Sequence, residues 1–192
     1  MPDLYLASAS PRRMELLLRA GFRPLAVPAR VAESRRRGEG PRTMVLRLAR
    51  AKAREAAGRL VARGARKGWV LAADTTVAVG RRVLEKPADA AGAAAMLRGL
   101  SGRSHTVHTG VCLLSLGDAG REAAAFVEDT RVWFRRLSLG EISAYVAGGE
   151  PMDKAGAYGI QGAAAAFVRR IEGDYCNVVG LPLARVVEAL SC

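Results

Sequence analysis

The chain has 192 residues, of which half are hydrophobic and a quarter are charged. This length suits one α/β-sized domain, predicted over residues 1–192, and excludes a large multidomain assembly. The composition excludes a disordered or fibrous chain. With 30 Lys and Arg against 18 Asp and Glu, the formal net charge of +12 favours anionic partners. Charge alone does not distinguish nucleic acid, anionic lipid and small molecules that carry polyphosphate.

The three cysteines, Cys112, Cys176 and Cys192, lie far apart and form no C-x-x-C motif, which argues against a disulfide framework or a zinc site. The amino-terminal segment lacks the basic and long apolar regions of a signal peptide. No stretch reaches the roughly 18 apolar residues of a membrane span. We therefore expect a soluble cytoplasmic protein in a reducing compartment, without a membrane partner.

The chain opens with a predicted strand, turn and helix. Residues 4–7 form a short apolar run, and apolar side chains recur at helical spacing after Ser10, which fits the N-cap. This places Arg12 and Arg13 in the first turn, where cations oppose the helix dipole unless an anion joins them. Both arginines, with the hydroxyls of Ser8 and Ser10, therefore indicate a phosphate-binding site. Solvated surface arginines are the alternative in this arginine-rich chain.

A second short strand is predicted at residues 25–27. It is followed by a charged loop that carries Glu33 and by a long helix over residues 41–63. Lys52 lies on this helix among small residues. From the sequence pattern alone, a solvated helical lysine is the favoured interpretation of Lys52.

The apolar run at residues 69–73 predicts a central strand that ends at Asp74. A carboxylate at the carboxyl end of a buried strand is where α/β folds place chemistry, although an Asp that caps a turn would give the same pattern. A hairpin over residues 77–84 follows, and Lys86 leaves it before a helix over residues 88–97. Asp74 and Lys86 thus flank one hairpin, and we expect them to face one cleft.

Two long strands are predicted at residues 104–116 and 121–134, paired with each other and joined by a loop at 117–120. His105 and His108 lie three residues apart in the first of these strands. They therefore point to opposite faces and are not expected to share a metal ion. The remaining predicted elements are a helix over residues 138–147, a strand over 165–171 and a closing helix over 179–190.

Residues 149–162 form a glycine-rich segment that we interpret as a structured loop. Glycine lets the backbone approach a ligand closely, and the Gln161 amide both donates and accepts hydrogen bonds, as recognition of a nucleobase edge requires. Asp153 and Lys154 add opposite charges to the segment. A buried Asp–Lys ion pair is the alternative explanation for these two residues.

Lysine is rare in this chain, since only four of the 30 basic residues are Lys. Three of the four, Lys52, Lys86 and Lys154, lie within the candidate segments described above. A compact ammonium differs from a planar guanidinium in size and hydration. We interpret these lysines as positions at which arginine does not substitute, with a chance distribution as the alternative.

Short motifs follow one another in order along the whole chain. They are Ser8-Ala-Ser-Pro-Arg-Arg13, Leu48-Ala-Arg-Ala-Lys52-Ala, Ala73-Asp-Thr75, Glu85-Lys-Pro87, Gly149-Glu-Pro151, Asp153-Lys-Ala-Gly-Ala-Tyr-Gly-Ile-Gln-Gly162 and Asn177-Val-Val-Gly-Leu-Pro-Leu183. This ordered set resembles the Maf family of nucleoside triphosphate pyrophosphatases. The resemblance implies a homodimer and a two-lobed α/β fold, in which helices flank an elongated, mixed and twisted sheet around a central cleft.

The resemblance also implies metal-dependent hydrolysis of a nucleoside triphosphate to the monophosphate and pyrophosphate, which removes non-standard nucleotides from the pool. Arg12, Thr75 and Gln161 are the combination typical of the branch that acts on dTTP and UTP. Thr75 and Gln161 are then expected to read the pyrimidine edge. The alternatives are hydrolysis of 7-methyl-GTP, as in another branch of the family, and non-catalytic inhibition of septum formation.

On this resemblance Asp74 is the base that deprotonates a water for in-line attack at the α-phosphorus. Lys52 and Lys86 are further catalytic residues, which neutralise the triphosphate together with a divalent cation, Mg²⁺ or Mn²⁺. Glu33 and Asp74 are the expected metal ligands, since Mg²⁺ takes one or two carboxylates beside substrate oxygens and water. The expected substrate-binding residues are Ser8, Ser10, Arg12, Arg13, Thr75, Asp153, Lys154 and Gln161.

Nucleic-acid binding is a different class of function that the net charge and the arginines at 35–37 suggest. Only 5% of the residues are aromatic, and no stacking motif or recognition helix stands out in the sequence. The expected partner is therefore a nucleoside triphosphate, and nucleic acid is not expected.

Overall fold

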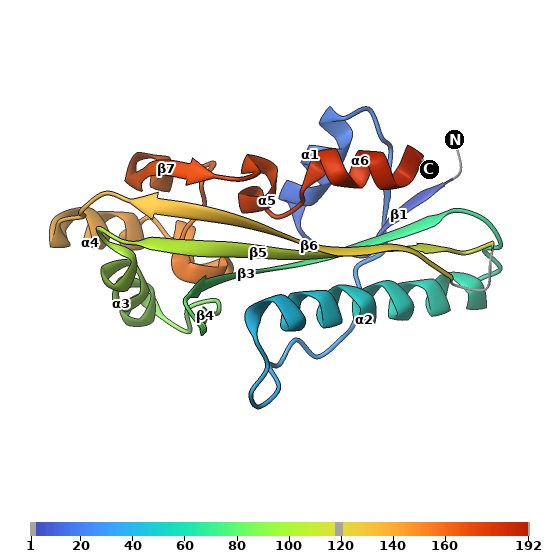
Figure 1. Cartoon of the computed structure of the whole chain (residues 1–192), viewed down its shortest axis with the longest axis horizontal. Coiled ribbons are helices and arrows are strands. Elements are labelled where there is room, and N and C mark those ends of the chain that lie inside the picture. Colours follow the sequence, from blue (N-terminus) through green and yellow to red (C-terminus); the bar gives the residue numbers. More distant parts are fainter. Residues whose placement is uncertain (1–2, 118–120, 192) are drawn as a thin grey trace.

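A seven-stranded mixed sheet forms the centre of the molecule (Figure 1). The computed structural model describes residues 3–117 and 121–191, so most of the loop predicted at 117–120 lies outside the described residues. The strands are β1 (Leu4–Leu6), β2 (Leu25–Ala26), β3 (Trp69–Val79), β4 (Arg82–Leu84), β5 (Ser104–Ser115), β6 (Arg121–Phe134) and β7 (Val168–Glu172). Their order is β2-β1-β3-β5-β6-β7, and β4 also pairs with β3. β1 is parallel to β2 and β3, whereas the other described pairs are antiparallel.

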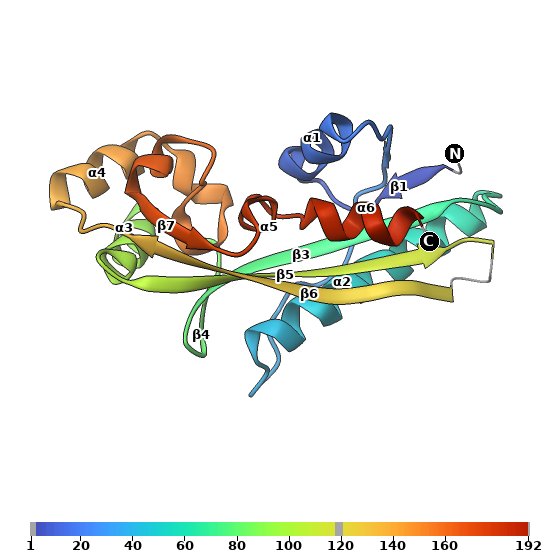
Figure 2. The same ribbon diagram turned by 45° about the horizontal axis from the view of Figure 1, so that its top comes forward.

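Helices cover both faces of this sheet. They are α1 (Pro11–Arg19), α2 (Pro41–Ala62), α3 (Ala90–Leu100), α4 (Leu139–Ala147), α5 (Tyr175–Val179) and α6 (Leu183–Ser191), with 3₁₀ segments η1 (Glu150–Asp153), η2 (Ala155–Ala157) and η3 (Ala163–Phe167). Figures 1 and 2 show α2 along one face, α1 and α6 over the other, and α3 and α4 at one end. The predicted α/β fold with an elongated, twisted sheet is thus confirmed. Among the described helices, none is long and apolar enough to cross a membrane.

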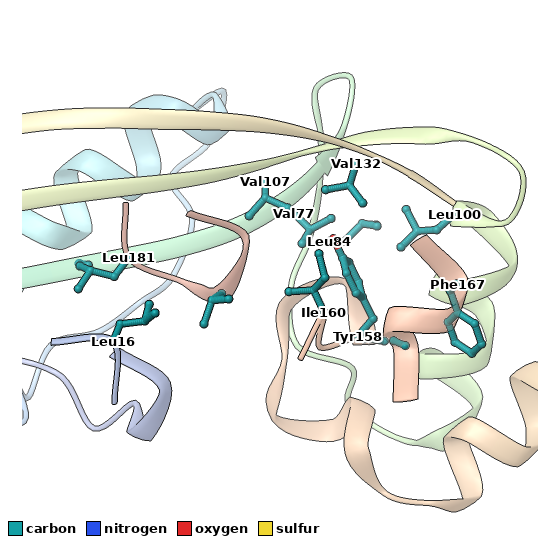
Figure 3. Packing of buried hydrophobic residues seen from close by; sticks show 14 of the residues in the cluster. Leu16, Val77, Leu84, Leu100, Val107, Val132, Tyr158, Ile160, Phe167 and Leu181 are labelled. Carbon is teal, nitrogen blue, oxygen red and sulfur yellow. The ribbon is translucent and has the colours of Figure 1, made fainter. Parts of the chain in front are cut away.

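Alternate residues of β3 point to two separate hydrophobic clusters. Val70 and Ala72 belong to the cluster beneath α2, where they pack with Ala53 and other small side chains. Leu71 and Val77 belong to the larger cluster on the opposite face, part of which Figure 3 shows. The strand is therefore buried on both sides, as its continuous apolar run predicts.

Helix α2 approaches β5 closely because one strand position has no side chain. Gly110 faces the backbone of Val45, and a Cβ at position 110 would overlap the Val45 carbonyl group. On α2 itself, Ala49 and Ala53 are fully buried and keep the interface thin. This close packing carries Lys52, on the same helix, to the side of β3.

One edge of β3 is only partly paired, and this leaves a gap in the sheet. β5 occupies one edge of the strand, so β1 and β4 share the other, at Trp69–Leu71 and Val77–Val79. Residues 72–76 between them have no strand partner on that edge in the part of the chain that the structure describes. Asp74 and Thr75 lie at the centre of this gap.

The prediction that the central strand ends at Asp74 is wrong. β3 continues to Val79. The three residues that follow Asp74 are Thr75, Thr76 and Val77, which are all β-branched and pair with β5. The strand that ends close to the carboxylate is β1, whose last residue lies opposite Leu71. Asp74 therefore lies in the middle of β3, at the gap in the sheet. It is neither at the end of a strand nor at the cap of a turn.

The carboxyl-terminal part also differs from the prediction. The strand expected at 165–171 is instead the 3₁₀ segment η3 followed by the shorter strand β7. The closing helix expected at 179–190 begins only at Leu183, as α6, and Val179 is the last residue of a separate short helix, α5. The break arises because Gly180 takes a left-handed conformation with φ 128°, and Pro182 follows it directly before α6.

Candidate active site

A cavity of about 510 Å³ opens at the gap along β3. Its walls come from the β1–α1 turn, α2, β3 and the segment that contains η1 and η2. Asp74 and Lys86 both face it, as their places around one hairpin predict. Every residue that the sequence analysis selected for the site lines this cavity: Ser8, Ser10, Arg12, Arg13, Glu33, Lys52, Asp74, Thr75, Lys86, Asp153, Lys154 and Gln161.

Two carboxylates share one lysine at the centre of the cavity. Lys52 Nζ donates a hydrogen bond of 2.6 Å to Asp74 Oδ1 and lies 2.6 Å from Glu33 Oε1. Lys52 and Asp74 are 8% and 6% exposed, so the buried charge of Asp74 is compensated mainly by Lys52. The interpretation of Lys52 as a solvated helical lysine is wrong, because this side of α2 packs against β3.

Glu33 is held in its ionised form by the cations around it. Partial burial by itself raises the pKa of Glu33, but the hydrogen bond and charge of Lys52, with smaller contributions from Lys86 and Arg13, outweigh burial and lower that pKa. The carboxylate side chain remains about half exposed, with 54% of its surface accessible. Glu33 is therefore charged and open to the cavity at neutral pH.

The loop that carries Glu33 is anchored by a pair of residues that the sequence analysis did not select. Arg47 on α2 binds both carboxylate oxygens of Glu39, at 2.6 and 2.7 Å, and donates to the Ser34 carbonyl at 3.1 Å. Hydrogen bonds from Arg47 lower the pKa of Glu39 to about 2. Arg47 thus ties Glu39 and Ser34, the residue next to Glu33, to α2 and so fixes the approach of Glu33 to Lys52.

The carboxylates of Glu33 and Asp74 fit a divalent cation that is bound together with a substrate. Both converge on one atom, Lys52 Nζ, and Mg²⁺ commonly takes one or two protein carboxylates while phosphate oxygens and water complete its octahedral shell. Within residues 3–117 and 121–191, no group of three or more His, Cys, Asp or Glu side chains is arranged to hold a metal ion. A cation at this place therefore needs oxygen atoms from the substrate.

Arg13 is a buried framework residue, and the alternative of a solvated surface arginine is wrong for it. Its side chain donates to the Gly180 carbonyl at 2.7 Å, to Ser8 Oγ at 3.0 Å and to Thr75 Oγ1 at 3.0 Å. These bonds join the β1–α1 turn, β3 and the α5–α6 connection. Thr75 Oγ1 also lies 2.8 Å from Thr109 Oγ1, so its hydroxyl is already engaged within the protein.

Arg12 lies at the rim of the cavity and is paired across it. Arg12 Nη1 is 3.3 Å from Asp153 Oδ2, and Lys154 Nζ is 2.5 Å from Asp153 Oδ1. The ion pair of the alternative explanation thus forms, but it is not buried, because the Asp153 side chain is 63% exposed. Asp153 instead holds two cations beside each other in the lining of the cavity.

Gln161 is presented by a tight turn in the glycine-rich segment. The Gly162 amide donates to the Gly159 carbonyl at 3.1 Å, which makes Gln161 one of the two central residues of the turn. Gln161 is exposed and lines the cavity, whereas Ile160 before it is buried. The predicted structured loop is thus confirmed, and it consists of short 3₁₀ segments around this turn.

The two histidines of β5 have separate partners on opposite faces of the sheet. His105 Nε2 lies 2.8 Å from the Tyr158 hydroxyl, and burial lowers the pKa of His105 to about 4. His108 Nδ1 lies 2.7 Å from Asp129 Oδ1. This arrangement confirms the prediction that the two side chains point to opposite faces.

The comparison with known families is decisive for this chain. The sequence model of the family described as Maf-like protein matches residues 3–192. The chain belongs to the Maf family. Other members are similar over nearly their whole length: a protein of Chelativorans sp. (strain BNC1) named dTTP/UTP pyrophosphatase is 51% identical over 190 residues, which cover 98% of this chain and 90% of that protein.

Two further Maf relatives carry the same name. The dTTP/UTP pyrophosphatase of Moorella thermoacetica is 52% identical and covers 100% of this chain and 95% of its own length. That of Salmonella typhimurium is 51% identical, with 100% and 93% covered. A solved HAM1 protein from Coxiella burnetii aligns over 100% of this chain and 99% of its own with a TM-score of 0.51 and 17% identity, which shows that the fold is shared.

Proposed function

We propose that this Maf protein is an enzyme that hydrolyses dTTP and UTP to the nucleoside monophosphate and pyrophosphate. The observation that carries the proposal is the pair of carboxylates on one buried lysine at the gap of β3. Hydrolysis of a phosphoanhydride needs a base for the water and cations for the triphosphate in one place. The names and the full-length similarity of the relatives support the choice of substrate.

In the proposed reaction Asp74 accepts a proton from a water molecule whose oxygen attacks the α-phosphorus. The bond between this phosphorus and the bridging oxygen breaks, and pyrophosphate leaves with that oxygen. Lys52 orients the Asp74 carboxylate through their 2.6 Å hydrogen bond and stabilises the negative charge that develops nearby. Lys86 and Arg12 contribute further positive charge along the triphosphate.

A divalent cation, Mg²⁺ or Mn²⁺, held by Glu33 and Asp74, neutralises phosphate charge when bound. Hydrogen bonds within the protein hold the side chains around this position in place. The Arg47–Glu39 pair keeps Glu33 in place, and Arg13 fixes the hydroxyl of Ser8 in the β1–α1 turn. The Ser10 amide also donates to Ser8 Oγ, at 3.2 Å, so the Ser10 hydroxyl is left for phosphate contacts.

Base selection is assigned to the turn that carries Gln161. Its amide is exposed in the cavity and offers a donor and an acceptor to a pyrimidine edge. Thr75 acts on selection indirectly, because its hydroxyl is bound by Arg13 and Thr109. The homodimer and the clearing of non-standard nucleotides follow from the family resemblance, and the cytoplasmic location follows from the sequence pattern. All three stay predictions, and sedimentation analysis tests the first.

The test is an assay with Mg²⁺ or Mn²⁺ and a panel of canonical, modified and 7-methylated nucleoside triphosphates, in which pyrophosphate is measured against orthophosphate. We expect pyrophosphate from dTTP and UTP, and its loss in Asp74→Asn. The matched control is Asp89→Asn, which lies outside the cavity at the N-cap of α3, where Asn also caps. Turnover of 7-methyl-GTP alone would reject the proposed substrate. Absence of all turnover would favour the non-catalytic alternative.

A further inference from the structure

One carboxylate supports the turn that presents Gln161. Glu150 Oε2 accepts a hydrogen bond of 3.0 Å from the Ala163 amide, directly after the turn. Glu150 Oε1 accepts a hydrogen bond of 2.9 Å from the Tyr145 hydroxyl. Glu150 lines the cavity but was not selected from the sequence, where it is one residue of a short motif beside a proline.

The second contact of Tyr145 extends this support to the start of the turn. The Gly159 amide donates to the Tyr145 hydroxyl at 3.2 Å. Tyr145 comes from α4, is only 7% exposed and stacks edge-on against Phe167 with the ring centroids 5.1 Å apart. Burial raises the pKa of Tyr145, so the hydroxyl keeps the proton that it donates to Glu150. The Glu150 carboxylate is thus linked to both ends of the turn. It bonds directly to the Ala163 amide after the turn, and it reaches Gly159 at the start of the turn through the Tyr145 hydroxyl.

The two glycines that bound the turn make room for this arrangement. A Cβ at Gly162 would overlap the Glu150 carboxylate, and a Cβ at Gly159 would lie 3.3 Å from Glu150 Oε1 and 2.7 Å from Lys154 Cε. Lys154 Nζ in turn donates to the Glu150 carbonyl at 2.6 Å. The turn therefore rests on the side chain of Glu150, and the glycines are explained by that contact.

The residues just before Gln161 are held by hydrophobic packing rather than by hydrogen bonds to Glu150. Ile160 and Tyr158 are 8% and 6% exposed and belong to the large hydrophobic cluster, where Figure 3 shows them close to Leu84 and Val77. Packing holds the turn from the core side, and Glu150 holds its ends. Within the turn, Gln161 is the exposed side chain that lines the cavity.

We propose that Glu150, together with Tyr145, is a positioning residue for nucleobase selection, which sets the orientation of the Gln161 turn. The inference rests on the proposed function, since it concerns how the pyrimidine of dTTP or UTP is distinguished. A carboxylate suits the role because both of its partners are donors. An amide at the same place would offer a donor of its own to one of them.

The test compares Glu150→Gln and Tyr145→Phe with the wild type on dTTP, on UTP and on ribose 5′-triphosphate, which has no base. For Glu150→Gln we expect kcat/KM on dTTP and UTP to fall about tenfold, mainly through KM, and to stay unchanged on ribose 5′-triphosphate. Tyr145→Phe should show the same pattern with a smaller loss, because the direct bond from the Ala163 amide survives. Glu172→Gln on β7, which pairs with Arg170 outside the cavity, is the matched control.

Equal losses on the base-free and the base-containing substrates would overturn the inference while leaving the proposed function intact, and so would an unchanged Glu150→Gln enzyme. Wild-type protein that leaves dTTP and UTP intact would overturn the proposed function and the inference with it. If Glu150→Gln unfolds, as its thermal midpoint will show, Tyr145→Phe decides the question, because it removes a single hydroxyl.

Discussion

The two ends of the cavity are constructed from different kinds of structure. The end that holds Asp74 consists of the long elements α2 and β3, whose buried side chains bring Lys52 and Asp74 together. The end that holds Gln161 consists of 3₁₀ segments and a tight turn, ordered by the hydrogen bonds that backbone amides donate to Glu150 and Tyr145. Lys52 and Asp74 thus depend on core packing, whereas the turn proposed for base selection depends in addition on a hydrogen-bond network around Glu150.

The strongest test of this contrast is removal of the shared cation at the catalytic end. Lys52→Met leaves the buried Asp74 carboxylate unpaired next to Glu33, and we expect the free energy of unfolding to fall by about 3 kcal/mol, with loss of activity. Urea denaturation measures the first effect. Lys67→Met, at an exposed lysine, is the control and should change little. A cost for Lys52→Met below about 1 kcal/mol, typical of a surface pair, would contradict the contrast.

A second test disturbs the same end from a distance. Gly110→Ala forces a methyl group against the backbone of Val45, and we expect a loss of about 1–3 kcal/mol in the free energy of unfolding. Activity should fall as well, because α2 carries Lys52. Gly58→Ala, on α2 where nothing lies within 4 Å, should instead stabilise the protein by about 1 kcal/mol. If the two substitutions behave alike, close packing of α2 is not what positions Lys52.

At the end of the cavity that holds Gln161, we expect a substitution to change substrate selectivity and to leave the thermal stability unchanged. Gln161→Ala should lower the ratio of kcat/KM for dTTP to that for purine triphosphates about tenfold, because one amide pair is lost. The thermal midpoint should stay at the wild-type value, since Gln161 is exposed. A drop in kcat that is equal for all nucleotides would instead place Gln161 with the catalytic groups.

The smallest expected effect concerns the loop that connects Glu33 to α2, and it depends on pH. The pKa of Glu39 is lowered from 4.5 to about 2, so the folded protein binds fewer protons than the unfolded chain between these values. The contribution of the Arg47–Glu39 pair is therefore full above about pH 4.5 and is lost as the pH falls towards 2. Denaturation at several acidic pH values should show a shallower pH dependence in Glu39→Gln than in the wild type. Identical slopes would show that the pair does not stabilise the loop.

The residues missed from the sequence share one property, which is that their partners are distant or irregularly spaced. Glu150 bonds to residues 13 positions ahead and 5 behind, and Arg47 to a residue 8 positions away, and in each case the partner lies outside the helix that carries the residue. Only the glycines at 159 and 162 hinted that a bulky group lies beneath the turn. The structure explains them, because a Cβ at Gly162 would overlap the Glu150 carboxylate and a Cβ at Gly159 would lie 3.3 Å from it.

The sequence by itself determined the order and type of most elements, the family and most of the charged side chains that line the cavity, because hydrophobic periodicity, caps and short motifs are local signals. Tertiary structure alone decided three things. Lys52 is buried because α2 packs closely against β5 at Gly110. Asp74 faces the cavity because β1 and β4 leave a gap on one edge of β3. Arg13 became a framework residue because it meets Gly180 from the other end of the chain. Each outcome depends on contacts between segments far apart in sequence, which no local pattern encodes.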